Sequence, residues 1–426
     1  MGAFAAKVGG AGILFGLHVL LARLLGVTQY GIYIYALTWA NILVIASLLG
    51  SNTALVRFVA AYKAQGKWGL LRGIVRRSTQ CVFVFSLLIG GIGGVTVWFL
   101  RDRIGRDEAA TFGVALILLP VLALVRLREA SLRALKRVVR SQLPTTIIRP
   151  LLLGAMLSGL YFCLRQPLLA IHAMAIDCVA VFAAFVIGAL WLVRELPEQV
   201  RGAEPIYADR EWLKVSLPLL LIDGMFVVLN QTDIIMLGVI RGSQEAGIYS
   251  AASHISSLAT FALIAVNMIL APMISELHHT GKKQDLQRII TLAARAIFVF
   301  TLLISAALTV SGRFVLCLFG SAFPVAFVPL LILLSGQIVN ALAGSVGLIM
   351  IMTGNQNQAG AIVAVSAAVN IMLNALLIPL LGLTGAAIST AFTMVLWNIA
   401  MFIFVRSRLG ISPSAIRCRF FQDMLW

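Results

Sequence analysis

The stretch LARLLGVTQYGIYIYAL, from Leu21 to Leu37, has a second copy about half a chain length later. This second copy, MLGVIRGSQEAGIYSAAS, runs from Met236 to Ser253 and shares the letters LGV and GIY with the first, so that Tyr249 corresponds to Tyr33. In both copies one long apolar run ends and another begins within a few residues, which predicts a turn between two helices. An internal repeat at this spacing predicts two structural repeats, an arrangement common among transporters.

The composition around this repeat is that of a membrane protein. Of 426 residues, 61% are hydrophobic and only 12% are charged, whereas soluble proteins are about 25% charged. Apolar runs of about 20 residues, each long enough to cross a hydrocarbon core, recur along the whole chain. Because the runs are continuous rather than alternating, they predict helices and exclude a β-barrel. The predicted fold class is therefore all-α, a polytopic membrane protein.

Twelve transmembrane helices are predicted. They lie near residues 8–27, 31–51, 80–100, 110–130, 146–164, 168–193, 216–240, 246–273, 289–312, 324–350, 359–380 and 384–405. The polar segment 194–214 separates the sixth from the seventh, so we expect an N-terminal bundle over residues 1–203 and a C-terminal bundle over 204–426. Six is an even number, so the bundles share one orientation, with a pseudo-two-fold axis along the membrane normal and the substrate site between them.

The net charge of +17 is best explained by membrane topology. With the N-terminus placed inside, 24 Lys and Arg residues fall in inner segments and six in outer segments. Lys and Arg accumulate in cytoplasmic loops, so this asymmetry predicts that both termini are cytoplasmic. Binding of nucleic acid, the usual reading of such a charge in a soluble chain, is not favoured.

Sequence patterns typical of enzymes and metal sites are absent. There is no G-x-x-x-x-G-K-[ST] loop and no H-E-x-x-H, and the five cysteines are scattered without C-x-x-C spacing. We therefore expect no enzymatic activity, no structural metal and no cofactor other than a coupling ion, H⁺ or Na⁺. Movement of a substrate through the membrane is the predicted activity.

Carboxylates inside predicted spans are candidates for ion coupling, since ionisable groups at that depth are costly. In the span 216–240, Asp223, Asn230 and Asp233 fall within an arc of roughly 80° and form one polar stripe. Asp177 lies near the middle of the span 168–193. We expect Asp233, Asp223 and Asp177 to serve a proton or sodium relay. The alternative is that they only form hydrogen bonds between helices.

Arginines in and beside the spans are candidates for binding an anion. Arg23, Arg149 and Arg295 lie within predicted spans, and Arg57 lies at the inner end of the second. Arg pairs with phosphate through two parallel hydrogen bonds, so these four are predicted to bind an anionic headgroup. The alternative is that their long side chains reach the nearest water interface.

Amides at helical spacing are candidates for contacts with sugar hydroxyls. Asn370 and Asn374 share one face of the eleventh span with Ser366, and Gln337 lies on the tenth. Together with Asn230 they are predicted to contact sugars, although such amides more often hold helices together.

Two further patterns concern the membrane surface. The cluster Tyr30, Tyr33, Tyr35 and Trp39 is predicted to form an aromatic belt at the outer interface. GKWGLLRGI, residues 66–74, alternates apolar with basic residues and predicts an amphipathic helix at the inner leaflet, or a solvated basic loop.

The sequence resembles a known family. The first span ends in LARLLGVTQYGIYIYAL, the seventh carries NQTDIIMLG followed by AGIYSAAS, and the eleventh leads through NIMLNALLIPLLGLTGAAIST. These stretches are similar to those of the Wzx-type polysaccharide flippases, in the multidrug/oligosaccharidyl-lipid/polysaccharide exporter superfamily. The resemblance implies a MATE-like fold of two six-helix bundles around a cleft. It also implies a monomeric carrier that moves an undecaprenyl-pyrophosphate-linked oligosaccharide across the bacterial cytoplasmic membrane by alternating access.

The resemblance also carries expectations about residues, partners and alternatives. In that family basic cleft residues are thought to bind pyrophosphate and a cation gradient to reset the carrier, roles for which Arg23, Arg149 and Asp233 are suitably placed. The substrate would be an O-antigen or exopolysaccharide precursor, with other polysaccharide-assembly membrane proteins as candidate partners. A multidrug/cation antiporter, a lipid II flippase and a membrane polymerase or glycosyltransferase remain alternatives. The lipid II branch usually has two more spans, and the last class needs large outer loops.

Overall fold

The protein is almost wholly helical in its computed structural model, which describes residues 2–164 and 166–415, without the side chains of residues 2–8, 221–223, 226, 228, 272 and 279. It divides into two compact units, Met1–Gln231 and Thr232–Trp426. The first unit contains α1 (Gly2–Leu48), α2 (Ser51–Ala64), α3 (Trp68–Ile104), α4 (Arg106–Ala134), α5 (Val138–Leu143), the π-helix η1 (Pro144–Ile148), α6 (Arg149–Leu164), α7 (Ala170–Glu195), α8 (Glu198–Gly202) and the first part of α9 (Asp209–Arg241).

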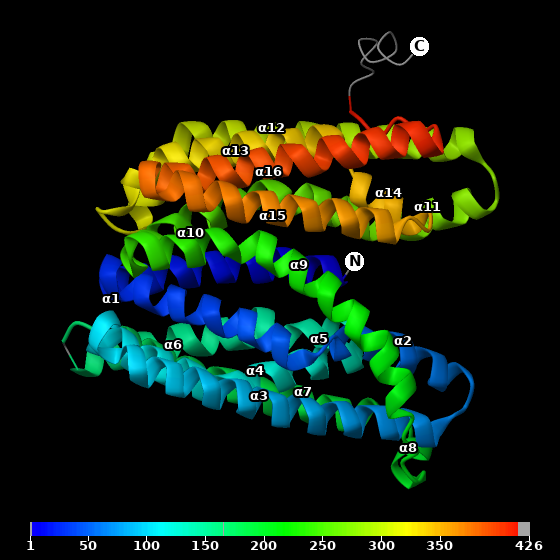
Figure 1. Cartoon of the computed structure of the whole chain (residues 1–426), viewed down its shortest axis with the longest axis horizontal. Helices are drawn as coiled ribbons and strands as arrows, with labels where there is room; N and C mark the ends of the chain where they lie inside the picture. The colour runs from blue at the N-terminus through cyan, green and yellow to red at the C-terminus, as the bar shows by residue number, and fades with distance from the viewer. Residues whose placement is uncertain (1, 165, 416–426) are drawn as a thin grey trace. The chain divides into compact units, whose positions relative to one another are not determined.

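The second unit begins within α9. It continues with α10 (Ser243–Ser257), η2 (Leu258–Thr260), α11 (Phe261–His279), α12 (Lys283–Phe319), η3 (Phe323–Ala326), α13 (Phe327–Ala343), α14 (Val346–Met352), α15 (Gln356–Leu381), α16 (Leu383–Phe404) and η4 (Val405–Leu409). Figure 1 shows the long helices of each unit running side by side. The predicted all-α fold class is confirmed.

Ten helical stretches of the described chain are long and apolar enough to cross a membrane. The first, Gly9–Leu48, contains two of the predicted spans, and the predicted span 216–240 lies within α9. The observed helices are therefore consistent with twelve spans. The chain is a multi-pass membrane protein.

The repeated stretch forms a helix reversal in each unit. Within α1, Gly26 has φ 75° and ψ 169°, a backbone conformation that glycine adopts without a steric penalty. In a continuous helix, residues 12 apart would be separated by about 18 Å. Instead Tyr30 Oη lies 3.2 Å from His18 Nδ1, so the two arms of α1 turn back on each other, as Figure 1 shows in dark blue. Gly242, with φ 98°, occupies the corresponding place between α9 and α10.

The prediction that the tyrosines of the aromatic cluster form a belt at the outer interface is wrong. Tyr30, Tyr33 and Tyr35 are 0%, 2% and 9% exposed, so they lie in the core of their unit. The turn at Gly26 folds the second arm of α1 into the bundle, and its aromatic face is covered by other helices. Tyr35, for example, packs edge-on against Phe112 of α4, with ring centroids 5.5 Å apart.

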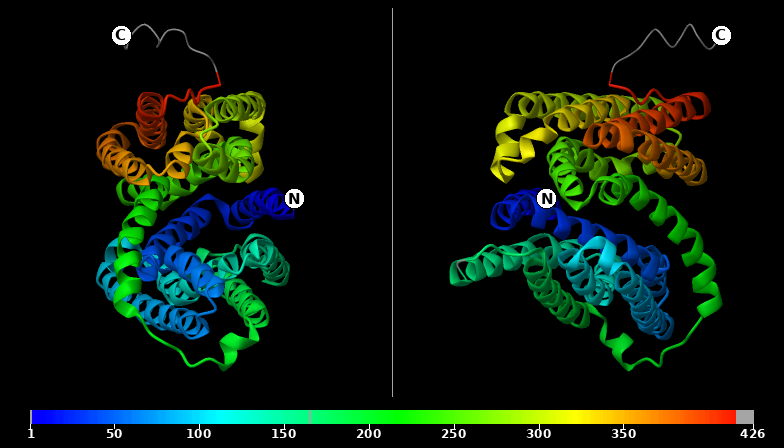
Figure 2. Two further views of the ribbon diagram at one scale, coloured as in Figure 1. Left: turned by 90° about the vertical axis from the view of Figure 1, so that its right-hand side faces the viewer. Right: turned by 60° about the vertical axis from the view of Figure 1, so that its left-hand side comes forward.

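The segment between α8 and α9, which we call the strap (residues 203–208), lies along the start of α3. Ile206 N donates to Gly69 O over 3.0 Å. Arg72 Nη1 donates to the carbonyls of Arg201 and Ala203, each over 2.7 Å. Figure 2 shows the strap as an extended green thread leading into α9. The strap and the start of α9 thus belong to the first unit, Met1–Gln231.

The close approach of the strap depends on a glycine. A Cβ at position 73 would lie 1.9 Å from the carbonyl oxygen of Ile206. We therefore expect Gly73→Ala to lower the free energy of unfolding by about 1–3 kcal/mol, as overpacking does. Thermal unfolding in detergent measures the loss. Gly91→Ala on the same helix is the matched control, since nothing lies within 4 Å of its Cβ. Equal stability of the two variants would contradict the docking of the strap.

Candidate functional site

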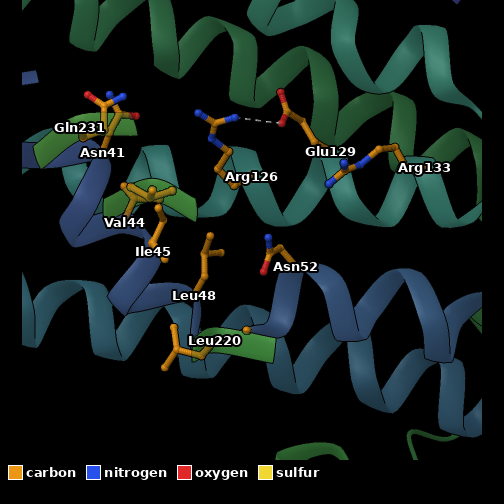
Figure 3. Close-up of a pocket in the computed structure, with 12 residues that line it drawn as sticks. Asn41, Val44, Ile45, Leu48, Asn52, Arg126, Glu129, Arg133, Leu220 and Gln231 are labelled. Atoms are coloured by element: carbon orange, nitrogen blue, oxygen red, sulfur yellow. Dashed lines mark ion pairs between the residues drawn. The ribbon is translucent and has the colours of Figure 1, made fainter. Parts of the chain in front are cut away.

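A polar pocket of about 580 Å³ lies in the first unit. It is formed by the second arm of α1, the start of α2, the C-terminal half of α4 and the first part of α9 (Figure 3). Its lining residues are Asn41, Val44, Ile45, Leu48, Gly50, Asn52, Arg126, Glu129, Arg133, Leu220, Val227 and Gln231. This volume is in the range of about 300–1,000 Å³ typical of small-molecule sites.

Three charged residues of α4 set the electrostatics of this pocket. Arg126, Glu129 and Arg133 are spaced by three and four residues, which places them on one face of the helix. Arg126 Nη1 lies 3.8 Å from Glu129 Oε2, as Figure 3 shows. Arg133 is exposed and forms no ion pair with any residue that the structure describes. Two guanidinium groups against one carboxylate leave the pocket with a net positive charge, which suits an anion.

These arginines were not among the residues that the sequence predicts for the site. The charge pattern assigns Arg126 and Arg133 to topology, because they follow the fourth apolar run at its inner end. A usable signal was present, since their spacing continues one face of that helix beyond its apolar part.

The predicted site residues Arg149 and Asp177 contact each other. Arg149 Nε donates to Asp177 Oδ1 over 2.8 Å, and Nη2 donates to Oδ2 over 2.6 Å. Tyr33 Oη donates to the same Oδ2 over 3.1 Å. The side chain of Asp177 is 0% exposed and that of Arg149 22%. A carboxylate buried to this degree needs a cation and hydrogen bonds to remain charged, and α6 and α1 supply both.

The π-helix η1 connects this ion pair with the pocket. Thr145 Oγ1 in η1 donates to Glu129 Oε1, and α6 begins directly after η1 with Arg149. Turns of π-helix are frequent at functional sites. Polar groups therefore extend from Arg126 in the pocket to Asp177 in the core of the unit.

The second unit holds a buried carboxylate without a cation. Asp233 is 4% exposed, and its Oδ2 accepts hydrogen bonds from Tyr249 Oη at 2.7 Å and Thr390 Oγ1 at 2.6 Å. Its Oδ1 accepts no hydrogen bond from the part of the chain that the structure describes. Among the described side chains, no Lys, Arg or His forms an ion pair with it. A carboxylate in such a place gains a proton or a cation at low cost, because burial of the bare charge is unfavourable.

Each of the two buried carboxylates accepts a hydrogen bond from one copy of the repeated tyrosine. Tyr33 and Tyr249 correspond in the repeat, and each donates to an aspartate. Asp177 of α7 and Thr390 of α16 are counterparts, since each lies seven residues after the start of its helix (170 to 177 and 383 to 390). The first unit thus has its acid on α7, whereas the second has a threonine at the corresponding place on α16 and its acid on α9.

The predicted amides form a network within the second unit. Asn374 Nδ2 donates to Asn370 Oδ1 over 2.9 Å, and Asn370 Nδ2 donates to Thr393 Oγ1 over 3.4 Å. Gln337 Oε1 accepts from Asn340 Nδ2 at 3.5 Å. These bonds hold α15 to α16 and stabilise the face of α13. Contact of Asn370, Asn374 and Gln337 with sugars stays a prediction.

The other predicted residues lie elsewhere. Arg23, Arg57 and Asn230 are exposed on α1, α2 and α9, and Arg295 is exposed on α12 with its Nε 3.4 Å from Ala415 O. None of the four lines the pocket. The side chain of Asp223 lies outside the part of the chain that the structure describes. Their roles in headgroup binding, sugar contact and ion coupling remain predictions.

Residues 3–278 match the family described as "Polysaccharide biosynthesis protein", well over half of the chain. The chain belongs to this family. The predicted resemblance to polysaccharide flippases is confirmed. Within curated proteins the chain is similar to "Probable flippase AglR" of Haloferax volcanii, with 30% identity over 172 residues. That match covers 39% of this chain and only 36% of the relative.

Several solved structures share the fold of this member of the polysaccharide biosynthesis family, among them the following two. An inward-facing MATE family transporter of the MOP superfamily has a TM-score of 0.77 at 14% identity, covering 93% of this chain and 94% of its own. The lipid II flippase MurJ in an inward closed conformation has a TM-score of 0.68 at 12% identity, covering 95% and 87%. At these identities the likeness establishes the MATE-like fold of the chain.

Proposed function

We propose that this protein is a flippase that moves a polyprenyl-pyrophosphate-linked oligosaccharide from the cytoplasmic to the outer leaflet for surface polysaccharide synthesis. The proposal places it in the bacterial cytoplasmic membrane, with both termini inside, as a monomeric carrier working by alternating access. The observation that carries it is the pocket in which Arg126 and Arg133 face the same space. Membership of the polysaccharide biosynthesis family supports the choice of substrate.

The chemistry of the pocket fits a diphosphate. A diphosphate carries about two negative charges, and two guanidinium groups offset them through paired hydrogen bonds. Asn41, Asn52 and Gln231 add neutral polar groups at the pocket wall. Glu129 competes with the ligand for Arg126, which limits the affinity and favours release on the far side.

We place the coupling ion, H⁺ or Na⁺, at Asp233. Its Oδ1, which accepts no hydrogen bond from the described residues, and the two hydroxyl partners on Oδ2 support binding of a small cation. Asp177 is a weaker candidate for this role because Arg149 already neutralises it. A gradient acting at one lone carboxylate would supply the free energy that resets the carrier.

The similarity to MurJ favours lipid II flipping as the second candidate, since lipid II also carries a diphosphate. A multidrug/cation antiporter of the same fold is less favoured, because a pocket with excess positive charge repels cationic drugs.

A chromosomal knockout tests the proposed function. We expect loss of cell-surface glycan together with accumulation of the lipid-linked oligosaccharide, both restored by the wild-type chain. Unchanged surface glycan with altered drug sensitivity would establish the antiporter instead. Loss of cell-wall precursor export with intact surface glycan would establish lipid II as the substrate.

The pocket itself is tested by removing its positive charge. We expect Arg126→Gln/Arg133→Gln to weaken binding of farnesyl pyrophosphate by about 100-fold, since two charge-assisted contacts of about 1.5 kcal/mol each are lost. Glu129→Gln is expected to strengthen the same binding. Titration calorimetry on the purified protein measures both. Arg103→Gln, which removes an exposed charge at the far end of α3, is the control. Equal affinity of all four proteins would refute the headgroup site.

A further inference from the structure

A second groove of about 250 Å³ lies between the start of α3 and the corner of α7 and α8. Residues 72, 75, 76, 79 and 80 line it from α3, at the spacing that puts them on one face of a helix. Leu196 and Val200 close the other side. The groove therefore has apolar walls with two arginines, Arg72 and Arg76, one helical turn apart.

Arg72 and Arg76 differ from the neighbouring Arg77 in that no described carboxylate pairs with either of them. Arg77 is occupied by Asp209, with Nε 3.1 Å from Oδ1 and 3.0 Å from Oδ2. Arg72 is held in place through Nη1, which donates to the carbonyl of Arg201 in α8 and to that of Ala203 in the strap. Arg76 is exposed and has no ion pair with any of the side chains described here. The groove thus combines the guanidinium of Arg72, which backbone carbonyls hold in place, with that of Arg76, whose charge no described carboxylate pairs.

The groove also opens where α3 becomes a lipid-facing helix. A few residues further along, Phe83, Val84, Leu87 and Leu88 are 45%, 52%, 50% and 56% exposed. In a multi-pass membrane protein, such an apolar surface lies against acyl chains. A molecule in the groove can therefore hold its anionic end at Arg72 and Arg76 while its apolar part follows α3 into the bilayer.

We propose that this groove binds an anionic phospholipid of the adjacent leaflet, separately from the transported substrate. A phosphodiester pairs with the two guanidinium groups, and an acyl chain covers Val75, Leu196 and Val200. A free phosphate would leave the apolar walls exposed. A zwitterionic lipid would bring an ammonium group next to Arg76. Arg72 also donates to Ala203 O of the strap, so lipid bound here lies beside the point where the strap is held to α3.

Native mass spectrometry of the full-length protein tests the proposal. The purified chain is incubated with phosphatidylglycerol or with phosphatidylcholine of the same acyl chains, and the retained lipid is counted. We expect one phosphatidylglycerol per chain to be retained in preference, and Arg76→Gln to weaken its retention about fivefold, the effect of one basic side chain near an anionic membrane surface. Val75→Phe, which fills the apolar wall, is expected to do the same.

Controls separate a site from general charge attraction. Lys63→Gln removes one exposed charge from the end of α2, outside the groove, and should retain lipid as the wild type does. Soluble glycerol phosphate should not displace phosphatidylglycerol. Equal losses in Arg76→Gln and Lys63→Gln, equal retention of the two lipids, or displacement by glycerol phosphate would overturn the proposal. Displacement of phosphatidylglycerol by farnesyl pyrophosphate would make the groove a substrate site and equally overturn it. The headgroup variants at Arg126 and Arg133 leave this outcome unchanged, so failure here and failure of the proposed function are distinguishable.

Discussion

Arg149→Met is expected to lower the free energy of unfolding by about 3–5 kcal/mol and to reduce the amount of protein in the membrane. The substitution leaves the carboxylate of Asp177, which is 0% exposed, without its cation, and removal of one partner of a buried ion pair costs this much. Tyr33 alone cannot compensate, since it supplies a single hydrogen bond. Chemical denaturation in detergent and membrane-fraction abundance measure the effect.

A double substitution distinguishes this role from headgroup binding. Arg149→Met/Asp177→Asn removes both charges and keeps an acceptor for Tyr33, so it should recover most of the lost stability. If Arg149→Met is as stable as the wild type but fails to restore surface polysaccharide, Arg149 binds the headgroup as the sequence predicts, and the ion pair is not needed for folding.

Asp233→Asn is expected to make transport independent of the cation gradient. For one coupled proton, a gradient of one pH unit is worth about 1.4 kcal/mol, or about tenfold in the ratio of substrate between leaflets. Asparagine is nearly isosteric and can still accept from Tyr249 and Thr390, but it cannot take up a proton or balance a cation. The variant should therefore equilibrate substrate to a ratio near one.

Proteoliposomes with an imposed proton or sodium gradient and a labelled lipid-linked oligosaccharide measure that ratio. Arg149→Met/Asp177→Asn serves as the comparison, because it removes the other buried carboxylate together with its cation. A wild-type ratio in Asp233→Asn under both gradients would exclude Asp233 as the coupling group. A collapsed ratio in the double variant alone would move coupling to the first unit.

The membrane helices could be predicted from sequence because each span carries its own signal. Long apolar runs need no tertiary information, and the repeated GIY stretch marks the reversal found at Gly26 and Gly242. The burial of Tyr33 could not be predicted in this way. An aromatic residue near a span end suits an interface and a core equally well, and only the packing of the bundle decides between them.

The site residues were less predictable because their partners are distant in sequence. Asp177 and Arg149 each satisfy the criteria for a functional charge when considered alone, yet the structure joins them in one ion pair. Conversely, Arg126 and Arg133 look like ordinary positive-inside residues until α1, α2 and α9 are placed around them. Hydropathy reports depth in the membrane, whereas the direction of a side chain follows from tertiary packing.

The shared tyrosine with two different acids has a consequence for how the chain arose. If one ancestral half was duplicated, the carboxylate has since moved to a different helix in one copy, so that it lies on α7 in the first unit and on α9 in the second. A tandem fusion of two first halves would then hold two Arg–Asp pairs, each already neutral. Such a protein would fold with its tyrosines satisfied and would have no place to load a cation.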